Sequence, residues 1–219
     1  MNRFSNDVDV LRFEPSVFTG ASFCGAVLCK GSSGQVNGTT FTAAGESFLS
    51  KQAEAGHVIY LSDGVGNIEG AYEIVSVDSS TQLTISVLRS DPSAQAIPVG
   101  SGSSLFYRIG TFDALAERIG FGITQMLGIQ PGVADSELAV KNITDTEAMR
   151  DYSALTTLAA VFMKLYQNAD TDKVYLSKNK HYQSLAEDAK RRTVVRLLRD
   201  DDRYYDKTLA GGHAWLLRK

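Results

Sequence analysis

The segment Thr144–Asn168, TDTEAMRDYSALTTLAAVFMKLYQN, decides the predicted fold of the second half of the chain. It begins with Thr144-Asp145-Thr146-Glu147, the S/T-x-x-E capping box that satisfies free amides at a helix N-terminus. The pattern predicts a helix to about Asn168 that is apolar over more than half of its circumference. Such a helix must be covered on two sides, by its own domain alone or together with a neighbouring chain. Its two apolar stripes are Ala148, Tyr152, Leu155, Ala159, Phe162 and Tyr166, and beside them Leu158, Val161 and Leu165.

Helical spacing continues on both sides of this segment. An amphipathic helix is predicted over Asp113–Leu127, ended by Gly128 and Pro131. After the short connection Asp170-Thr171-Asp172, a last helix is predicted from Leu176 to Arg199, packing back antiparallel on the first. Its contact residues are expected to be Tyr182, Leu185, Ala189, Val194 or Val195, and Leu198.

The first half of the chain has the pattern of a β protein. Gly, Ser and Thr are dense there, and the apolar runs are short and β-branched. We expect a small antiparallel barrel or sandwich. The clearest predicted strands are His57–Leu61, Ala71–Val77, Gln82–Leu88 and Leu105–Ile109, with a hairpin connection at Asp78–Thr81; weaker candidates are Val8–Phe13, Ala26–Lys30 and Ser47–Ser50, and loops are predicted at Gly31–Gly34 and Asp91–Gly102.

The predicted fold class is therefore α+β, an N-terminal small antiparallel barrel or sandwich followed by a helical bundle and an extended C-terminal tail. We expect a β-rich module over residues 1–110, an α-helical core over 111–200 and the tail over 201–219.

Composition excludes several functional classes. Hydrophobic residues make up 43% and charged residues 21% of the 219 residues, as in an ordinary folded protein, and the net charge of −3 favours neither nucleic acid nor anionic lipid. The chain shows no secretory signal and no apolar run of about 18 residues, so we expect no membrane partner and a reducing compartment. Cys24 and Cys29 fit that compartment; with three scattered histidines they offer too few ligands for a metal site.

Catalytic signatures are also missing from the sequence. There is no G-x-S-x-G elbow and no phosphate-binding loop, and Gly64-Val65-Gly66 has the wrong spacing for a dinucleotide fingerprint. Asp200-Asp201-Asp202 lacks the alternation of a calcium loop and is interpreted as a solvated helix stop. We expect neither an enzyme nor a cofactor.

Positive charge gathers towards the end of the last predicted helix, at Lys190, Arg191, Arg192, Arg196 and Arg199. The simpler interpretation is a solvated face. The alternative is a basic helix that meets an acidic partner surface or passing DNA.

The chain ends in an apolar segment after two glycines. Gly211-Gly212 is followed by His213-Ala214-Trp215-Leu216-Leu217-Arg218-Lys219, which contains the single tryptophan. Free termini are normally polar. The segment therefore either folds back onto its own domain or adds to another subunit as a strand or pocket anchor.

The helical half resembles the head-to-tail adaptor (connector) proteins of tailed bacteriophages. The similarity lies in TDTEAMRDYSALTTLAAVFMKLYQN, in AEDAKRRTVVRLLRDDD and in the end LLRK, over roughly the last 110 residues. In that family a β domain of this size is an insertion or elaboration. The resemblance implies a homo-oligomeric ring, commonly of twelve subunits, in the virion neck, made in the cytoplasm of the host bacterium.

The same resemblance implies partners. The ring lies between the portal protein and a downstream neck or tail protein, and its lumen passes DNA without reading it. Trp215, Leu216, Leu217 and Arg218 would dock on the portal, and the basic helix would face acidic neighbours or the channel. Two other interpretations stay open: a stopper, tail-terminator or baseplate subunit that makes its contacts through the barrel, and a non-specific DNA-binding protein.

Overall fold

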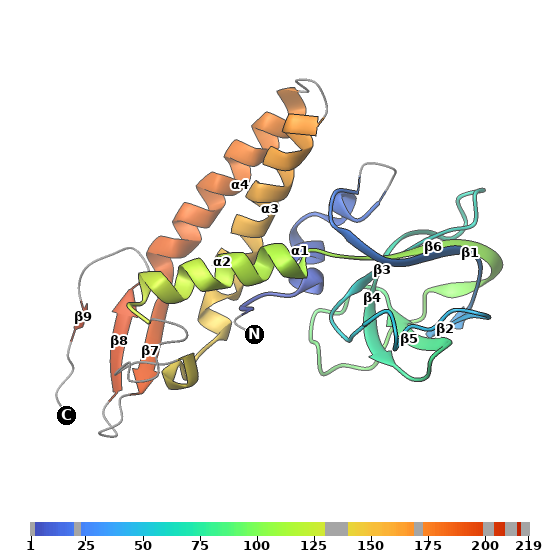
Figure 1. Cartoon of the computed structure of the whole chain (residues 1–219), viewed down its shortest axis with the longest axis horizontal. Helices are drawn as coiled ribbons and strands as arrows, with labels where there is room; N and C mark the ends of the chain where they lie inside the picture. The colour runs from blue at the N-terminus through green and yellow to red at the C-terminus, as the bar shows by residue number, and fades with distance from the viewer. Residues whose placement is uncertain are drawn as a thin grey trace. The chain divides into compact units, whose positions relative to one another are not determined.

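The computed structural model describes residues 3–19, 23–129, 140–168, 173–198, 204–208 and 214–215 (Figure 1). Its fold class is α+β, with an antiparallel barrel followed by helices, which confirms the sequence prediction at that level. The chain forms two compact units, one of Val10–Phe112 and one of Met1–Asp9 with Asp113–Lys219. The first residues of the chain thus group with the helices rather than with the strands.

The barrel unit is a closed barrel of six strands in the order β1-β2-β5-β4-β3-β6, with every neighbouring pair antiparallel. Closure leaves no open sheet edge, which is how small β domains avoid pairing with other chains. The strands are β1 Ala26–Gly38, β2 Thr40–Ala43, β3 Val58–Ser62, β4 Glu69–Val77, β5 Gln82–Ser86 and β6 Gly100–Thr111.

Alternation along the strands builds the barrel core. On β6, Leu105, Tyr107 and Ile109 are 0–3% exposed and belong to the core, whereas Phe106 between them is 39% exposed. Side chains two residues apart share one face of a strand, so β6 has an inner and an outer row. Phe41 and Phe48 lie 6.1 Å apart between ring centroids inside the same core. The four clearest predicted strands and the hairpin after Val77 are confirmed.

Two of the weaker strand predictions are wrong. Residues Val8–Phe13 lie in the helix α1, Asp7–Phe13. At its start, the amides and side chains of Asn6 and Asp9 bond reciprocally, Asn6 N–H to Asp9 Oδ2 at 2.9 Å and Asp9 N–H to Asn6 Oδ1 at 3.0 Å. This exchange starts a helix in the manner of a capping box. Ser47–Ser50 forms turns instead of a strand.

The loop predicted at Gly31–Gly34 is wrong as well, because β1 runs through it with register shifts against β6. The glycines serve close packing here. A Cβ on Gly31 would lie 2.7 Å from the ring of Tyr107, and one on Gly34 would lie 2.8 Å from the ring of Phe41. The strand can therefore pass over two core aromatics only without side chains at these positions. The predicted loop Asp91–Gly102 ends earlier, where β6 begins at Gly100.

The helical unit contains α2 (Asp113–Met126), α3 (Arg150–Asn168) and α4 (Lys173–Arg192). Helix α2 ends as predicted at Gly128, which has φ +71°. The Ile129 amide bonds to Thr124 O and the Gly128 amide to Gln125 O, both at 2.9 Å, the two bonds of a Schellman motif. Pro131 lies outside the described residues.

The start of α3 differs from the predicted capping box. Asp145 supplies the cap by accepting the Ala148 amide at 3.2 Å, and the 3₁₀ turn Glu147–Met149 leads into the helix. The Thr144 hydroxyl instead donates to Arg196 O at 3.1 Å, and the Glu147 carboxylate pairs with Arg150. A tertiary contact therefore occupies the Thr144 hydroxyl, and a local i,i+3 ion pair occupies the Glu147 carboxylate, so the predicted box does not form.

Helices α3 and α4 lie side by side along most of their length (Figure 1). The rings of Phe162 and Tyr182 stack at 5.5 Å between centroids with an interplanar angle of 4°. The Asn179 side-chain amide donates to Ala159 O at 2.7 Å, which satisfies a buried polar group between the helices. Among the described residues, no helix is long and apolar enough to cross a membrane.

The last helix was predicted to continue to Arg199, which is wrong. Helix α4 ends at Arg192, and Val194–Leu198 forms the strand β7. The Thr193 hydroxyl bonds to Ala189 O at 2.8 Å at the helix end. Beyond it the chain alternates as a strand does, because Val195 and Leu197 are fully buried whereas Val194 is 48% exposed.

Candidate interaction surfaces

A three-stranded antiparallel sheet, β7-β8-β9, follows the helices and contains Trp215, the one predicted docking residue that lies within the described residues. Strand β8 (Tyr204–Thr208) pairs with β7 over all five of its residues. Strand β9 (Ala214–Trp215) pairs with β8 only through Asp206↔Trp215 and Lys207↔Ala214. The backbone of Trp215 is thus paired within its own chain. Leu216, Leu217 and Arg218 lie outside the described residues, as does the Gly211-Gly212 pair.

The two edges of this sheet differ. At the β7 edge, Ile143 forms a bridge with Leu197, the Thr144 amide donates to Arg196 O at 3.1 Å, and Asn142 Nδ2 donates to Leu198 O at 2.6 Å. That edge is therefore covered. Within the part of the chain that the structure describes, no strand pairs with the outer edge of β9. A sheet edge with unpaired backbone groups is a template for strand addition.

The predicted basic helix face is not a single face. Lys190, Arg191 and Arg192 occupy the last turn of α4, whereas Arg196 is an exposed residue of β7. Arg199 lies outside the described residues. Positive charge at a helix C-terminus offsets the macrodipole, and Arg192 Nε also donates to Asp188 O at 3.2 Å. These side chains therefore have a local structural role, which the simpler interpretation of a solvated face accommodates.

A groove of about 480 Å³ lies between α3 and α4. Its lining includes Tyr152, Ala159, Ala186 and Glu187. Burial raises the pKa of the Tyr152 hydroxyl in this groove, and the charge of Glu187 adds to the effect. The hydroxyl therefore stays protonated at physiological pH, and it donates to Met126 Sδ at 3.9 Å.

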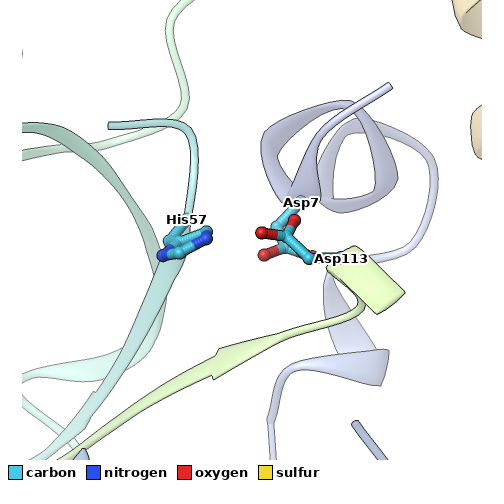
Figure 2. A group of neighbouring side chains, drawn as sticks. All are labelled: Asp7, His57 and Asp113. Atoms are coloured by element: carbon cyan, nitrogen blue, oxygen red, sulfur yellow. The ribbon is translucent and has the colours of Figure 1, made fainter. Parts of the chain in front are cut away.

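In the helical unit, the acidic pair Asp7 and Asp113 is the group of side chains that most resembles a metal site. Carboxylate oxygens of the two residues approach within 4.8 Å (Figure 2). Arg3 forms an ion pair with Asp113, which compensates part of this negative charge. His57, also labelled in Figure 2, belongs to the barrel unit, where its Nδ1 accepts the Glu54 amide at 3.1 Å. Two carboxylates, one of which already pairs with Arg3, are too few ligands to assign a metal.

A surface that sequence reasoning missed lies on the outside of the barrel. A cavity of about 490 Å³ is lined by residues of β1 and β6 together with Phe23. The signal was present in Leu105–Ile109, LFYRI, where alternation sends Phe106 and Arg108 to the face opposite the core. Only the pairing of β6 with β1 and β3 brings these side chains next to their neighbours. Comparison of this chain with protein-family models, curated proteins and solved structures found no match.

Proposed function

We propose that this chain is a structural subunit of the neck of a tailed-phage virion, a head-to-tail adaptor that assembles as a ring between portal and tail. The single observation that carries the proposal is the order of parts after residue 144. Two long packed helices run into a small sheet, and the last strand of that sheet contains Trp215. These are the segments in which the sequence resembles the adaptor family.

The weak pairing of β9 supports a docking role for the tail. Two residue pairs hold β9 on β8, whereas five hold β8 on β7. Each net backbone hydrogen bond is worth only about 0.5–1.5 kcal/mol, so detaching a two-residue strand costs little. In the proposed assembly Trp215–Arg218 leaves its own sheet and anchors on the portal, where tryptophan is a favoured hot-spot residue.

Docking of the tail on the portal also assigns the other parts of the proposed ring. The helical bundle would form the ring body and the tail would extend to the portal. Lys190, Arg191, Arg192 and Arg196 would face acidic neighbours or the DNA channel, with no base-specific contact needed. No catalytic step, cofactor or membrane is part of the proposal.

The test measures the mass of the purified full-length chain alone and with a portal, by native mass spectrometry and light scattering. The expected result is a ring, or a chain that joins a ring only on the portal. Deleting Gly211–Lys219 should abolish portal co-sedimentation while leaving the circular dichroism spectrum unchanged. Full-strength binding of the truncated chain would refute the docking role of the tail.

A matched pair of variants separates anchoring from charge. Trp215→Ala should weaken portal binding by at least tenfold, since truncating a hot-spot residue costs about 2 kcal/mol or more. Arg218→Ala should have a smaller effect that disappears at high salt.

A second location within the virion is favoured by one observation on the barrel. Val65 is 79% exposed at the tip of the β3–β4 connection, and the Asp63 carboxylate holds that tip by accepting the amides of Val65 and Gly66 at 2.9 and 2.7 Å. A rigid apolar tip suits a stopper, tail-terminator or baseplate subunit that uses the barrel as its contact module. Locating the subunit in particles by electron microscopy distinguishes the two positions.

A further inference from the structure

The outer face of the barrel carries an ordered row of side chains across three strands. Lys30 of β1 is in register with Arg108 of β6, and Arg108 is in register with Tyr60 of β3. Phe106, two residues before Arg108, lies on the same face of β6. The core residues Tyr107 and Ile109 point to the other side, into the barrel. The row is therefore separate from the packing that closes the barrel.

Arg108 is held in one place by aromatic rings. Its guanidinium carbon lies 4.8 Å from the centroid of Phe23 and 5.3 Å from that of Tyr60. Its Nη2 also donates to Phe18 O at 2.7 Å, and the residue is only 9% exposed. Cation–π contacts and this hydrogen bond fix a positive charge at the base of the face. A fixed charge loses less side-chain entropy on binding than a mobile lysine does.

The cavity of about 490 Å³ opens beside this charge. Phe106 offers it a ring that is 39% exposed and is oriented by an edge contact with Tyr60, at 6.2 Å between centroids and 63° between planes. Phe23 lies over Gly110, where a Cβ would come within 2.4 Å of its ring. The β1 irregularity places Gly31 and Ser32 at the rim, with backbone and hydroxyl groups.

The charge of the cavity has one sign. Two cations, Lys30 and Arg108, are among its lining residues, and no carboxylate is, within the part of the chain that the structure describes. Glu69, which accepts the hydroxyl of Tyr60 at 3.1 Å, is not a lining residue. A pocket with aromatic rings and positive charge suits a ligand with a flat ring and a phosphate. Stacking on an exposed aromatic and pairing of phosphate with lysine are the two contacts by which proteins hold single-stranded nucleic acid.

We propose that this face of the barrel binds single-stranded nucleic acid, with one base stacked on Phe106 and the adjoining phosphate on Lys30. The observations favour a strand over an acidic peptide because two aromatic rings, Phe106 and Phe23, line the cavity with the cations. The site is distinct from the basic residues at the end of α4. It goes beyond the role of a neck adaptor and does not depend on it, since the row belongs to the barrel unit alone.

The experiment measures the fluorescence anisotropy of a labelled twelve-nucleotide oligo(dT) titrated with the full-length chain at low salt. Binding is expected, with an affinity that falls with a salt slope near −0.7 for each phosphate contacted. Phe106→Leu keeps an apolar side chain but removes the ring, and should weaken binding roughly 5- to 150-fold, the effect of losing one stacked base. Phe106→Trp should retain binding. Lys30→Ala should weaken binding and make the salt slope shallower by about 0.7.

Four controls, one variant and three other ligands, accompany the titration. Val65→Ala, at an exposed apolar residue outside the cavity, should leave the affinity unchanged. A twelve-base-pair duplex should bind more weakly than oligo(dT), because its bases are already stacked. Inorganic tripolyphosphate, a probe of charge alone, should compete poorly. The proposal is overturned if oligo(dT) does not bind, if Phe106→Leu binds as well as the wild type, or if duplex or tripolyphosphate binds equally well. Equal binding of a labelled poly-glutamate peptide would also overturn it.

Discussion

At the residue scale, the two cysteines of the barrel unit differ in reactivity. Cys29 is 7% exposed, and burial, reinforced by the charge of Glu46, raises its pKa to about 12. Cys24 is half-buried. Because the thiolate is the reactive form, iodoacetamide at pH 8 should modify Cys24 and spare Cys29 in the folded chain. Peptide mass spectrometry reads this out, and both thiols should react in 6 M guanidinium. Equal labelling of both thiols in the native chain would contradict the assignment.

The same thiol implies a pH dependence of stability. A raised folded-state pKa means that the unfolded chain loses the proton first, so this contribution to stability is intact below about pH 9 and is lost between there and about pH 12. Burial also raises the pKa of the Tyr107 hydroxyl, with the charge of Glu46 and a hydrogen bond to it adding, which acts in the same direction. The melting temperature should fall from pH 8 to pH 10.5, and less so in Cys29→Val.

The ion pair of Glu73 and Arg89 is a second residue-scale test. Both side chains are at most 10% exposed, and Arg89 also donates to Ala94 O. Removing one partner leaves a buried charge uncompensated, so Glu73→Ala should lower the free energy of unfolding by about 3–5 kcal/mol. Arg191→Ala breaks an exposed pair with Asp188 at 3.9 Å and should cost less than about 1 kcal/mol. The free energy of unfolding of each variant is measured by urea titration, with the near-ultraviolet circular dichroism of the tyrosines as the signal.

At the element scale, the end of α2 gives a matched pair of glycine variants. Gly128 has φ +71°, which an L-residue adopts at a cost, so Gly128→Ala should lower the free energy of unfolding by about 1–2 kcal/mol. A Cβ at Gly122, within the same helix, meets nothing within 4 Å. Gly122→Ala should therefore raise the free energy of unfolding by about 0.5–1 kcal/mol. Hydrogen exchange along α2 should show opposite changes for the two variants.

The start of α3 gives another element-scale prediction. Asp145→Ala removes the side chain that accepts the Ala148 amide and should cost about 1 kcal/mol, with faster exchange of the first-turn amides. Thr144→Val removes the hydroxyl's bond to Arg196 O, while the bond from the Thr144 amide remains, and should loosen β7 instead. If Thr144→Val frayed the helix and Asp145→Ala did not, the capping box read from the sequence would be right after all.

At the scale of the whole molecule, the proposed function depends on assembly rather than on chemistry. The chain contains a closed barrel, which has no strand edge to offer, and a small sheet whose β9 edge is unpaired within the described residues. If subunits or the portal add a strand to this chain, the strand should therefore add to the β7-β8-β9 sheet and not to the barrel. Trp215→Pro, which removes an amide from β9, should reduce ring formation on the portal, whereas Val65→Asp should leave it intact. Sedimentation velocity with and without portal measures this.

Local pattern was enough to predict the strands β3, β4, β5 and β6, the first residues of β1, and the helices α2 and α3. Each of these depends on side-chain periodicity or on a glycine such as Gly128, and both are properties of neighbouring residues. Helix α1 and strand β7 were missed in the sequence for the opposite reason. Val8–Phe13 and Val194–Leu198 are short apolar runs, and in such runs the spacing of apolar residues does not distinguish helix from strand. The reciprocal cap of Asn6 and Asp9 favours the helix α1, and pairing with β8 favours the strand β7.

Tertiary structure alone decided which residues meet. Glycines that read as a loop at Gly31–Gly34 are explained only by the rings of Tyr107 and Phe41, which come from distant strands. The predicted basic face is split between two elements because α4 ends at Arg192 and β7 begins at Val194. Lys30, Arg108 and Tyr60 form a row only because β6 pairs with both β1 and β3. Sequence by itself determined the strands β3 to β6 and the helices α2 and α3 in their order, since those follow from local periodicity. Register and close packing, which are set by contacts between residues far apart in the chain, determined the surfaces.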